Sequence, residues 1–264
     1  MSDGGNGASA VGMLSGKTCV VMGIQNRWSI AYAIADQMAA AGARIALTYV
    51  DERAGRDALT LAEQHGGKGY ICNVESDDDL DRLATDLAHD FGRIDSLVHS
   101  IGFAPAAELE GRFIDTSRDG FRVAMSVSCY SLVAATRRIA PLMSEGGSVM
   151  TLTYLGADRA FPKYNVMGVA KAALESSVRY LAYDLGGQRI RVNAISAGPV
   201  KTAAARGIPG FADIYKAMLE RAPLQDEFGA AQVAKVAVFL ASDAASAITA
   251  ETIFVDNGYH AMGM

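Results

Sequence analysis

The stretch TCVVMGIQNRWSIAYAIADQMAAAG, residues 18–42, predicts a strand, a turn and a helix in close succession. Residues 18–22 are a short apolar run typical of a buried strand, and residues 29–41 are the small and apolar residues of a packed helix. Gly42 stands where helices commonly end, because glycine adopts the left-handed conformation without strain. The stretch therefore predicts a βα unit, the building block of parallel sheets.

The same alternation of apolar runs and amphipathic segments continues along the chain, without an internal repeat or a linker. Further strands are expected at residues 44–49, 69–72, 94–100, 148–152, 191–195 and 252–255. Further helices are expected at residues 53–64, from 76 onward, 117–143, after 153 to about 185, and 230–240. Residues 202–221 have the least regular pattern. We predict a single α/β domain, residues 14–264, with a doubly wound, Rossmann-like sheet of about seven parallel strands and helices on both faces.

The composition is that of a globular protein, with a net charge of −5 and 50% hydrophobic residues. No apolar span is long enough to cross a bilayer and no Lys/Arg tract stands out, so neither a membrane nor nucleic acid is expected as a partner. Cys19, Cys72 and Cys129 are widely spaced and odd in number, which argues against a disulfide framework and for a cytoplasmic location. Residues 1–13 have the composition of a flexible leader and lack the features of a signal peptide.

A group of carboxylates follows Ser76, at Asp77, Asp78, Asp79 and Asp81. Such a cluster can suggest a metal site, but acidic residues are also favoured in the first turn of a helix because the helix dipole is positive there. We therefore expect a helix start at Ser76 and no metal.

The turn between the first strand and the first helix is the expected place for a phosphate group, since a helix N-terminus offers free N–H groups to an anion. Gly23 permits a sharp exit from the strand, and Ser29 can cap the helix and also donate to a pyrophosphate. Ala31 is small enough for close packing of the helix on the sheet. Only one of the usual three glycines is present, so an ordinary capped turn explains this segment equally well.

The residues after the second strand bear on which dinucleotide is bound. Asp51 and Glu52 suit a free ribose hydroxyl and would repel a 2′-phosphate, and Arg53 is the only base nearby. NADH is therefore expected in preference to NADPH. Val50 weakens this inference, because its side chain offers no polar contact to the ribose.

The ends of the third and fourth strands supply further candidates for cofactor binding. Asn73, followed by Val74, can bind the edge of an adenine or can simply form a turn. Gly102, after Ile101, would let the backbone approach a cofactor closely. His99 lies within an apolar strand, so we expect a structural role for it and not a catalytic one.

Residues 153–171 carry Tyr154, Tyr164 and Lys171 from the fifth strand into a helix. Tyr164 and Lys171 are seven residues apart, two turns of a helix, which predicts that both side chains project from one face. A packing helix that happens to contain both residues is the alternative.

Taken together, these segments resemble the short-chain dehydrogenase/reductase superfamily and, within it, the NADH-dependent bacterial enoyl-acyl carrier protein reductases of fatty acid synthesis. The resemblance extends from about residue 14 to residue 261. Its motifs are Gly23-x5-Ser29-Ile30-Ala31, residues 99–105 (HSIGFAP), 154–157 (YLGA), 164–168 (YNVMG) with Lys171, and 191–199 (RVNAISAGP).

One departure from the wider superfamily distinguishes enoyl reduction from ketone reduction. Ketone-reducing members have a tyrosine four residues before the lysine and a serine seventeen residues before it, where this chain has Met167 and Tyr154. The enoyl reductase pattern, a tyrosine seven residues before the lysine, is complete with Tyr164 and Lys171. A carbonyl reductase and a non-catalytic dinucleotide-binding sensor remain as alternatives.

The resemblance also implies roles for residues. Tyr164 would donate a hydrogen bond to the thioester oxygen, Lys171 would bind the nicotinamide ribose, and Tyr154 would line the acyl pocket as the third member of the catalytic set. The implied cofactor contacts are Gly23, Ile24, Ser29, Ile30, Asn73, Val74, Ile101, Gly102, Lys171, Val200 and Thr202.

The partners implied by the resemblance are acyl carrier protein bearing the enoyl substrate and further copies of the chain in a homotetramer. Residues from about 200 to 221 resemble the substrate-binding loop of the family. Four bases there, Lys201, Arg206, Lys216 and Arg221, can meet the acidic carrier protein or can form a merely solvated surface.

Overall fold

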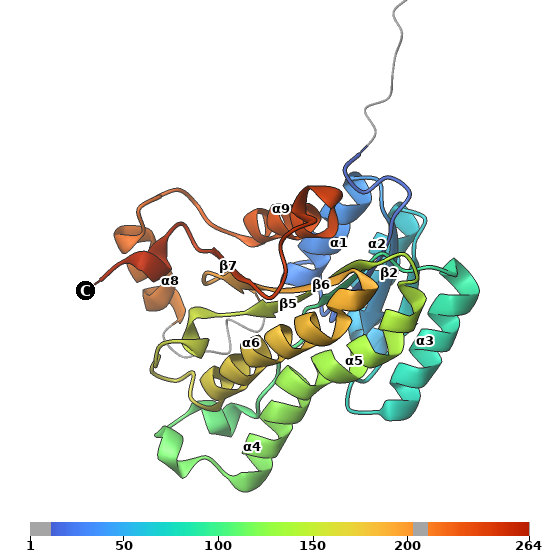
Figure 1. Ribbon diagram of the computed structural model, residues 1–264. Helices are drawn as coiled ribbons and strands as arrows, with labels where there is room; N and C mark the ends of the chain where they lie inside the picture. The colour runs from blue at the N-terminus through green and yellow to red at the C-terminus, as the bar shows by residue number, and fades with distance from the viewer. Residues whose placement is uncertain (1–11, 203–210, 264) are drawn as a thin grey trace, which may run out of the picture.

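A central sheet of seven parallel strands organises the computed structural model, which describes residues 12–202 and 211–263 (Figure 1). The strands are β1 (Thr18–Met22), β2 (Arg44–Tyr49), β3 (Lys68–Ile71), β4 (Ser96–His99), β5 (Gly147–Thr153), β6 (Ile190–Ala197) and β7 (Thr252–Val255). The predicted sheet is confirmed, with strand ends within two residues of those expected. Most of the expected leader, and residues 203–210 of the expected substrate loop, lie outside the described part of the chain.

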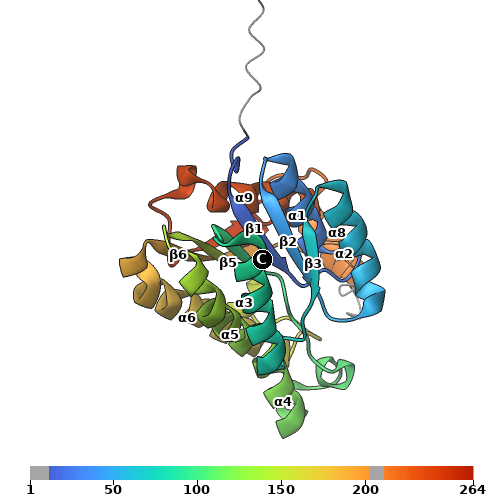
Figure 2. The same ribbon diagram turned by 90° about the vertical axis from the view of Figure 1, so that its right-hand side faces the viewer.

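Helices cover both faces of the sheet, as predicted. They are α1 (Ile30–Ala40), α2 (Glu52–Gln64), α3 (Asp77–Phe91), α4 (Arg118–Met125), α5 (Ser131–Ile139), α6 (Val166–Leu185), α8 (Phe211–Arg221) and α9 (Ala230–Ala241). Helices α1 and α9 lie on one face and α3, α5 and α6 on the other (Figures 1 and 2). Each face is sealed by its own large cluster of buried apolar side chains, so the sheet has a core on both sides.

The strand order β3-β2-β1-β4-β5-β6-β7 places the first strand between the two halves of the sheet. From β1 the chain moves outward through β2 and β3, and then returns to build β4 to β7 on the other side of β1. The connections after β1 and β4 therefore leave the sheet in opposite directions. In open α/β sheets, ligands bind outside the carboxyl ends of the strands at this switch point.

Polar caps explain where several helices begin. The side chains of Ser29, Asp51, Ser76 and Ser117 each accept a hydrogen bond from a backbone N–H group in the first turn of α1, α2, α3 and α4, respectively. The predicted helix start at Ser76 is thus confirmed.

Three of the four carboxylates that follow Ser76 form ion pairs with arginines. Asp77 and Asp81 both pair with Arg138 of α5, and Asp79 pairs with Arg82. Within residues 12–202 and 211–263, no cluster of three potential metal ligands is found. In the same part of the chain, no helix has the length and apolar character needed to span a bilayer.

Two expectations about helices were wrong in detail. No helix was expected in residues 202–221, which have the least regular pattern, but their second half forms α8. The single helix expected at residues 117–143 is divided by a π-helical turn, Ser126–Tyr130, between α4 and α5. Such a turn contains one residue more than an α-helical turn and is often found beside functional sites.

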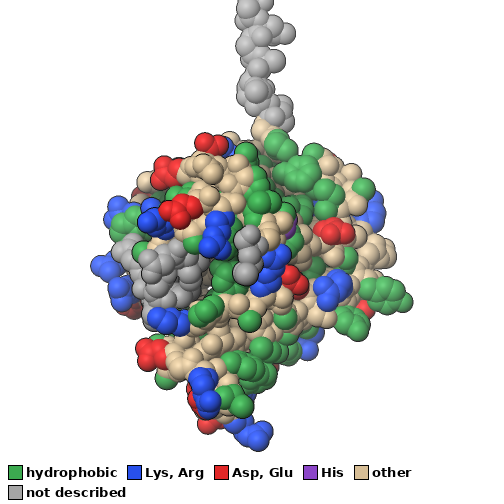
Figure 3. Space-filling model, turned by 90° about the vertical axis from the view of Figure 1, so that its left-hand side faces the viewer, with side chains coloured by type: hydrophobic (Ala, Val, Ile, Leu, Met, Phe, Trp, Pro, Cys, Tyr) green, Lys and Arg blue, Asp and Glu red, His purple; other side chains and the backbone are tan. Residues whose placement is uncertain are grey.

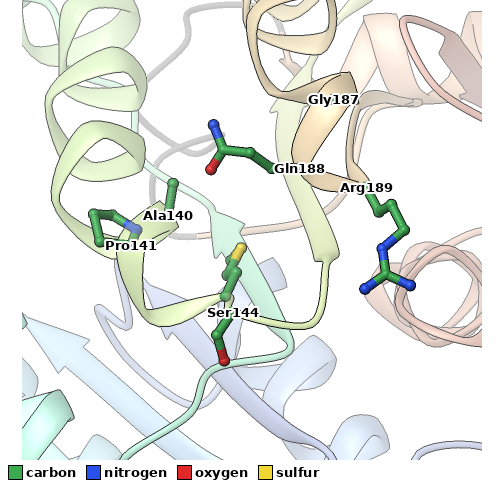
Figure 4. A pocket seen from close by; sticks show the side chains of 7 residues that line it. Ala140, Pro141, Ser144, Gly187, Gln188 and Arg189 are labelled. Atoms are coloured by element: carbon green, nitrogen blue, oxygen red, sulfur yellow. The ribbon is translucent and has the colours of Figure 1, made fainter.

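A hollow of about 310 Å³ lies at the amino ends of β5 and β6, at the opposite end of these strands from the switch-point crevice. Residues that follow α5 and residues from the turn before β6 line it. Figure 4 shows the side chain of Gln188 directed toward Ala140, while that of Arg189 extends away. This hollow is therefore separate from the predicted cofactor site.

Candidate active site

Gly23 brings the exits of β1 and β4 into direct backbone contact. Its φ of +92° lies in the left-handed region, and a Cβ at this position would lie 2.3 Å from the carbonyl oxygen of Ser100. Both observations disfavour any other residue here, and the sharp exit from the strand that Gly23 was expected to permit is confirmed. The neighbouring Ile24 is buried in the core, which leaves only its backbone available to a cofactor.

Ser29 is the N-cap residue of α1, as predicted. Its hydroxyl donates to the carbonyl of Asn26 at 2.8 Å and accepts from the N–H of Tyr32 at 3.3 Å. Ile30 begins the helix, and Ala31 is buried against the sheet. The first N–H groups of the helix have no acceptor within it and carry positive partial charge, which fits a dinucleotide pyrophosphate.

The ends of β2 and β3 are turns whose polar side chains bind the backbone. Asp51 caps α2 by accepting from the N–H of Ala54 at 2.8 Å, and the side chain of Val50 is exposed. Asn73 accepts from the N–H of Glu75 at 3.1 Å, so the turn-forming role considered for it is confirmed. Contacts of Asn73 and Val74 with adenine stay predictions.

His99 has a structural role, as expected. It is fully buried, with its ring nitrogens 2.9 Å from Thr151 Oγ1 and 2.8 Å from Ser131 Oγ. Burial, reinforced by the nearby charge of Lys171, lowers the pKa of the imidazole to about 3. The ring is therefore neutral and holds β4, β5 and α5 together.

Lys171 extends from α6 to the carboxyl ends of β4 and β5. Its Nζ donates to the carbonyl of Leu152 at 2.7 Å, and a Cβ at Gly102 would lie 3.4 Å from Nζ. Burial lowers the pKa of Lys171 to about 8, although the nearby Cys129 and Glu175 act in the opposite direction. The amine is therefore mostly charged at neutral pH. Lys171 and Gly102, both predicted to bind the cofactor, therefore lie close together.

Tyr154, Phe161 and Tyr164 form an aromatic cluster beside this lysine helix. The ring of Tyr154 lies 5.0 Å from that of Tyr164 at 69° and 5.2 Å from that of Phe161, between centroids. Burial raises the pKa of both tyrosines, so their hydroxyls stay protonated at neutral pH and can donate. The structure thus brings together the two tyrosines that the sequence predicted.

Tyr164 does not lie on the lysine helix, contrary to the expectation from helical spacing. Helix α6 begins at Val166, and Asn165 before it has a φ of +41°. Tyr164 belongs to the preceding turn, and its ring packs against the start of α6 together with Met167. Its orientation is therefore set by packing and not by helical periodicity.

Gly156 makes room for the ring of Tyr164. A Cβ at Gly156 would lie 2.5 Å from Cδ1 and 2.6 Å from Cε1 of Tyr164. Gly168 of α6 is restricted in turn, since its Cβ would lie 2.8 Å from the carbonyl oxygen of Gly156. No separate role was predicted for either glycine, although both belong to the motifs that carry the family resemblance.

Ser128 also belongs to the site and was not predicted. It lies on the π-helical turn, where its Oγ accepts from the N–H of Phe103 and donates to the carbonyl of Phe103, both at 2.9 Å. Its Oγ also lies 3.6 Å from Met167 Sδ. The turn thereby fixes the segment after Gly102 against α6.

Beyond β6, Val200 is buried and Thr202 donates its backbone N–H to the carbonyl of Val200 at 2.7 Å. The ammonium of Lys201 lies 4.3 Å from the ring centroid of Tyr215. Lys216 pairs with Glu220 at 3.7 Å. Arg206 lies outside the described residues.

The switch point of the sheet lies beside the buried Lys171 and two partly buried tyrosines at the carboxyl ends of β4 and β5. This arrangement defines a reductase of the short-chain dehydrogenase type. The family model described as enoyl-(acyl carrier protein) reductase matches residues 23–260. The chain belongs to this family.

Individual relatives are similar over nearly the whole chain. The enoyl-[acyl-carrier-protein] reductase [NADH] of Bacillus cereus is 46% identical over 254 residues, 95% of this chain and 99% of the relative. A crystal structure of the Bacillus cereus enoyl-acyl carrier protein reductase with NADP+ and indole naphthyridinone has a TM-score of 0.94 at 46% identity, covering 96% of this chain and 100% of that one. The reductase of Anaplasma phagocytophilum in complex with NAD has a TM-score of 0.92 at 43% identity, covering 96% and 97%.

Proposed function

We propose that this enzyme reduces the trans-2 double bond of enoyl thioesters carried on acyl carrier protein, with NADH as the reductant, in fatty acid synthesis. One observation carries the proposal. Tyr164, held between Gly156 and Tyr154, stands beside the helix of the buried Lys171, while Met167 occupies the position of a ketone reductase's acid.

The residues support this reaction as follows. NADH, when bound, supplies the hydride that adds to the β-carbon of the thioester. Negative charge then develops on the thioester oxygen, where the protonated hydroxyl of Tyr164 donates a hydrogen bond. One well-placed donor of this kind stabilises a transition state by about 3 kcal/mol. Transfer of a proton to the α-carbon completes the reduction. Lys171 holds the nicotinamide ribose, and Tyr154 lines the acyl pocket beside Tyr164.

The two alternatives receive less support from the structure. A carbonyl reductase would need an acid where Met167 is, and this thioether is buried against Ser128 and the Gly102 segment. A non-catalytic binding protein would have no use for a protonated tyrosine packed beside the cofactor lysine.

The preference for NADH over NADPH rests on Asp51 and Glu52 at the end of β2. The carboxylate of Asp51 is fixed there by its cap on α2, and it would repel a 2′-phosphate. Arg53 is exposed in the first turn of α2, and its positive charge would instead favour a 2′-phosphate. A comparison of KM for NADH and NADPH tests the preference, and equal values would contradict it.

The proposed acidic carrier protein would dock on the face that carries α8, where Figure 3 shows Lys and Arg side chains. Lys216 and Arg221 belong to that helix.

The proposed homotetramer would cover the aromatic side chains that α6 leaves exposed, because Tyr180 and Tyr183 are 73% and 86% exposed. The three cysteines are free and buried, which suits the proposed cytoplasmic location.

Substrate comparison tests the reaction itself. Purified protein is mixed with NADH and an enoyl thioester, or with a β-ketoacyl thioester, and the loss of NADH is followed by absorbance. We expect oxidation with the enoyl substrate alone. Oxidation with only the ketoacyl substrate would support a carbonyl reductase, and NADH binding without turnover of either would support a sensor.

A further inference from the structure

A carboxylate lies one helical turn beyond Lys171 on α6. Glu175 is half-buried and accepts a hydrogen bond from Thr153 Oγ1 at 2.7 Å. Thr153 directly follows Leu152, whose carbonyl accepts the 2.7 Å hydrogen bond from Lys171 Nζ. Two consecutive residues at the end of β5 thus hold the lysine and the carboxylate in fixed positions.

Lys171 is buried, and the charged groups around it bear on its protonation. Burial lowers the pKa of Lys171, and the groups that oppose this effect are Cys129 on the π-helical turn and Glu175. His99 on β4 also lies near the lysine but is kept neutral. Glu175 follows Lys171 by four residues on α6, so both side chains leave the same face of the helix. Among the described residues, it is the carboxylate whose charge favours the ammonium of Lys171.

The surroundings of Glu175 hold its carboxylate in place and keep it from full hydration. Burial, together with Asp158, raises the pKa of Glu175 above its ordinary value, although the Thr153 hydrogen bond, Arg179 and Lys171 act in the opposite direction. The Thr153 hydroxyl fixes the carboxylate by donating to it, so the pair is oriented before any ligand binds.

We propose that Glu175, oriented by Thr153, keeps the buried Lys171 amine charged at neutral pH and is thereby a positioning residue for cofactor binding. The inference rests on the proposed function, because it takes Lys171 to be the residue that holds the nicotinamide ribose. A neutral lysine would be a weaker partner for the ribose hydroxyls, since charged donors form the stronger hydrogen bonds.

The pH dependence of NADH affinity distinguishes this role from a purely structural one. Glu175→Gln preserves the shape and the acceptor for Thr153 but removes the charge. In wild-type protein, NADH affinity measured by fluorescence should weaken above about pH 8, as Lys171 loses its proton. In the variant, the midpoint pH, at which NADH affinity is half lost, should fall by about one unit. Near pH 7.5 this shift corresponds to a roughly threefold loss of NADH affinity.

Three further variants make the test specific. Glu175→Asp retains the charge and should restore most of the wild-type profile, whereas Thr153→Val should shift the midpoint downward by a smaller amount. Asp184→Asn makes the same charge change at an exposed position near the end of α6 and should leave the profile unchanged.

Superimposable profiles for wild type and Glu175→Gln would overturn the inference, as would a wild-type NADH affinity that is constant between about pH 6 and pH 9.5. Enoyl reduction would persist in both cases, so the proposed function would stand. Failure of the wild type to bind NADH or reduce an enoyl thioester would instead overturn the proposed function.

Discussion

The contact between Gly156 and Tyr164 makes Gly156→Ala a sharp test of the active-site geometry. The new Cβ would lie 2.5 Å from one ring carbon of Tyr164 and 3.1 Å from Cδ1 of Tyr154. Carbon atoms that are not bonded normally lie about 3.5–4.0 Å apart, so the Tyr164 ring must move by about 1 Å. The two tyrosines also pack against each other, at 5.0 Å between centroids, which limits how either can yield.

The expected effect is larger on turnover than on stability. Overpacking of this kind costs about 1–3 kcal/mol of unfolding free energy. A displacement of about 1 Å in a catalytic group can lower turnover by about a hundredfold. NADH affinity should change little, because the three atoms nearest to the added methyl group belong to Tyr164 and Tyr154 and not to Lys171 or Gly102.

Steady-state turnover of an enoyl thioester, NADH affinity by fluorescence and unfolding by denaturant would measure the three effects. Gly186→Ala is the matched control, since its Cβ would meet no atom within 4 Å at the end of α6. That variant should keep wild-type turnover. A folded Gly156→Ala protein with wild-type turnover would refute the assignment of Tyr164 as a precisely placed donor.

Three other predictions test separate parts of the molecule. Tyr164→Phe should lower kcat by about a hundredfold while leaving NADH affinity unchanged in a binding titration, because only the hydroxyl is lost; full activity would contradict the donor role. Gly23→Ala should weaken NADH binding and lower the melting temperature, because the Cβ would strike the carbonyl of Ser100 and φ is positive; a wild-type melting curve would show that the turn can relax. His99 makes the free energy of unfolding depend on pH. The pKa of its imidazole is about 3 in the native protein but 6.5 in the unfolded chain. As the pH falls below 6.5, only the unfolded state therefore gains a proton. The unfolding free energy should therefore drop by about 2 kcal/mol between pH 6.5 and pH 5 from this residue, and denaturant titrations of His99→Gln should show a smaller drop; an equal drop in both proteins would contradict the assignment.

Much of the fold was predictable because local patterns determine it. The apolar runs marked the strands, and the serine and aspartate caps marked the starts of helices such as α1 and α3. His99 was placed in the core for the same reason, since its neighbours in β4 are apolar. The cofactor end of the sheet followed from the βα alternation, because parallel strands bring their carboxyl ends together.

The missed features depend on contacts between segments far apart in the chain. Periodicity placed Tyr164 on the lysine helix, but Asn165 adopts a positive φ, and its side chain lies 3.4 Å from the carbonyls of Glu108 and Gly111. The role of Ser128 depends on its approach to Phe103, which no local pattern indicates. Helix α8 was missed because the expected irregular segment combined it with the preceding residues, which contain glycine and proline.

Several close approaches around the active site depend on a missing Cβ, at Gly23, Gly156 and Gly168. Every single-base change in a glycine codon that substitutes another residue introduces a Cβ. Random mutation at these positions can therefore only add atoms where the structure has no space for them. In a saturation library selected for growth, these glycines should be among the most depleted positions. Variants with altered acyl specificity should instead arise at the aromatic side of the pocket, where a side chain can become smaller.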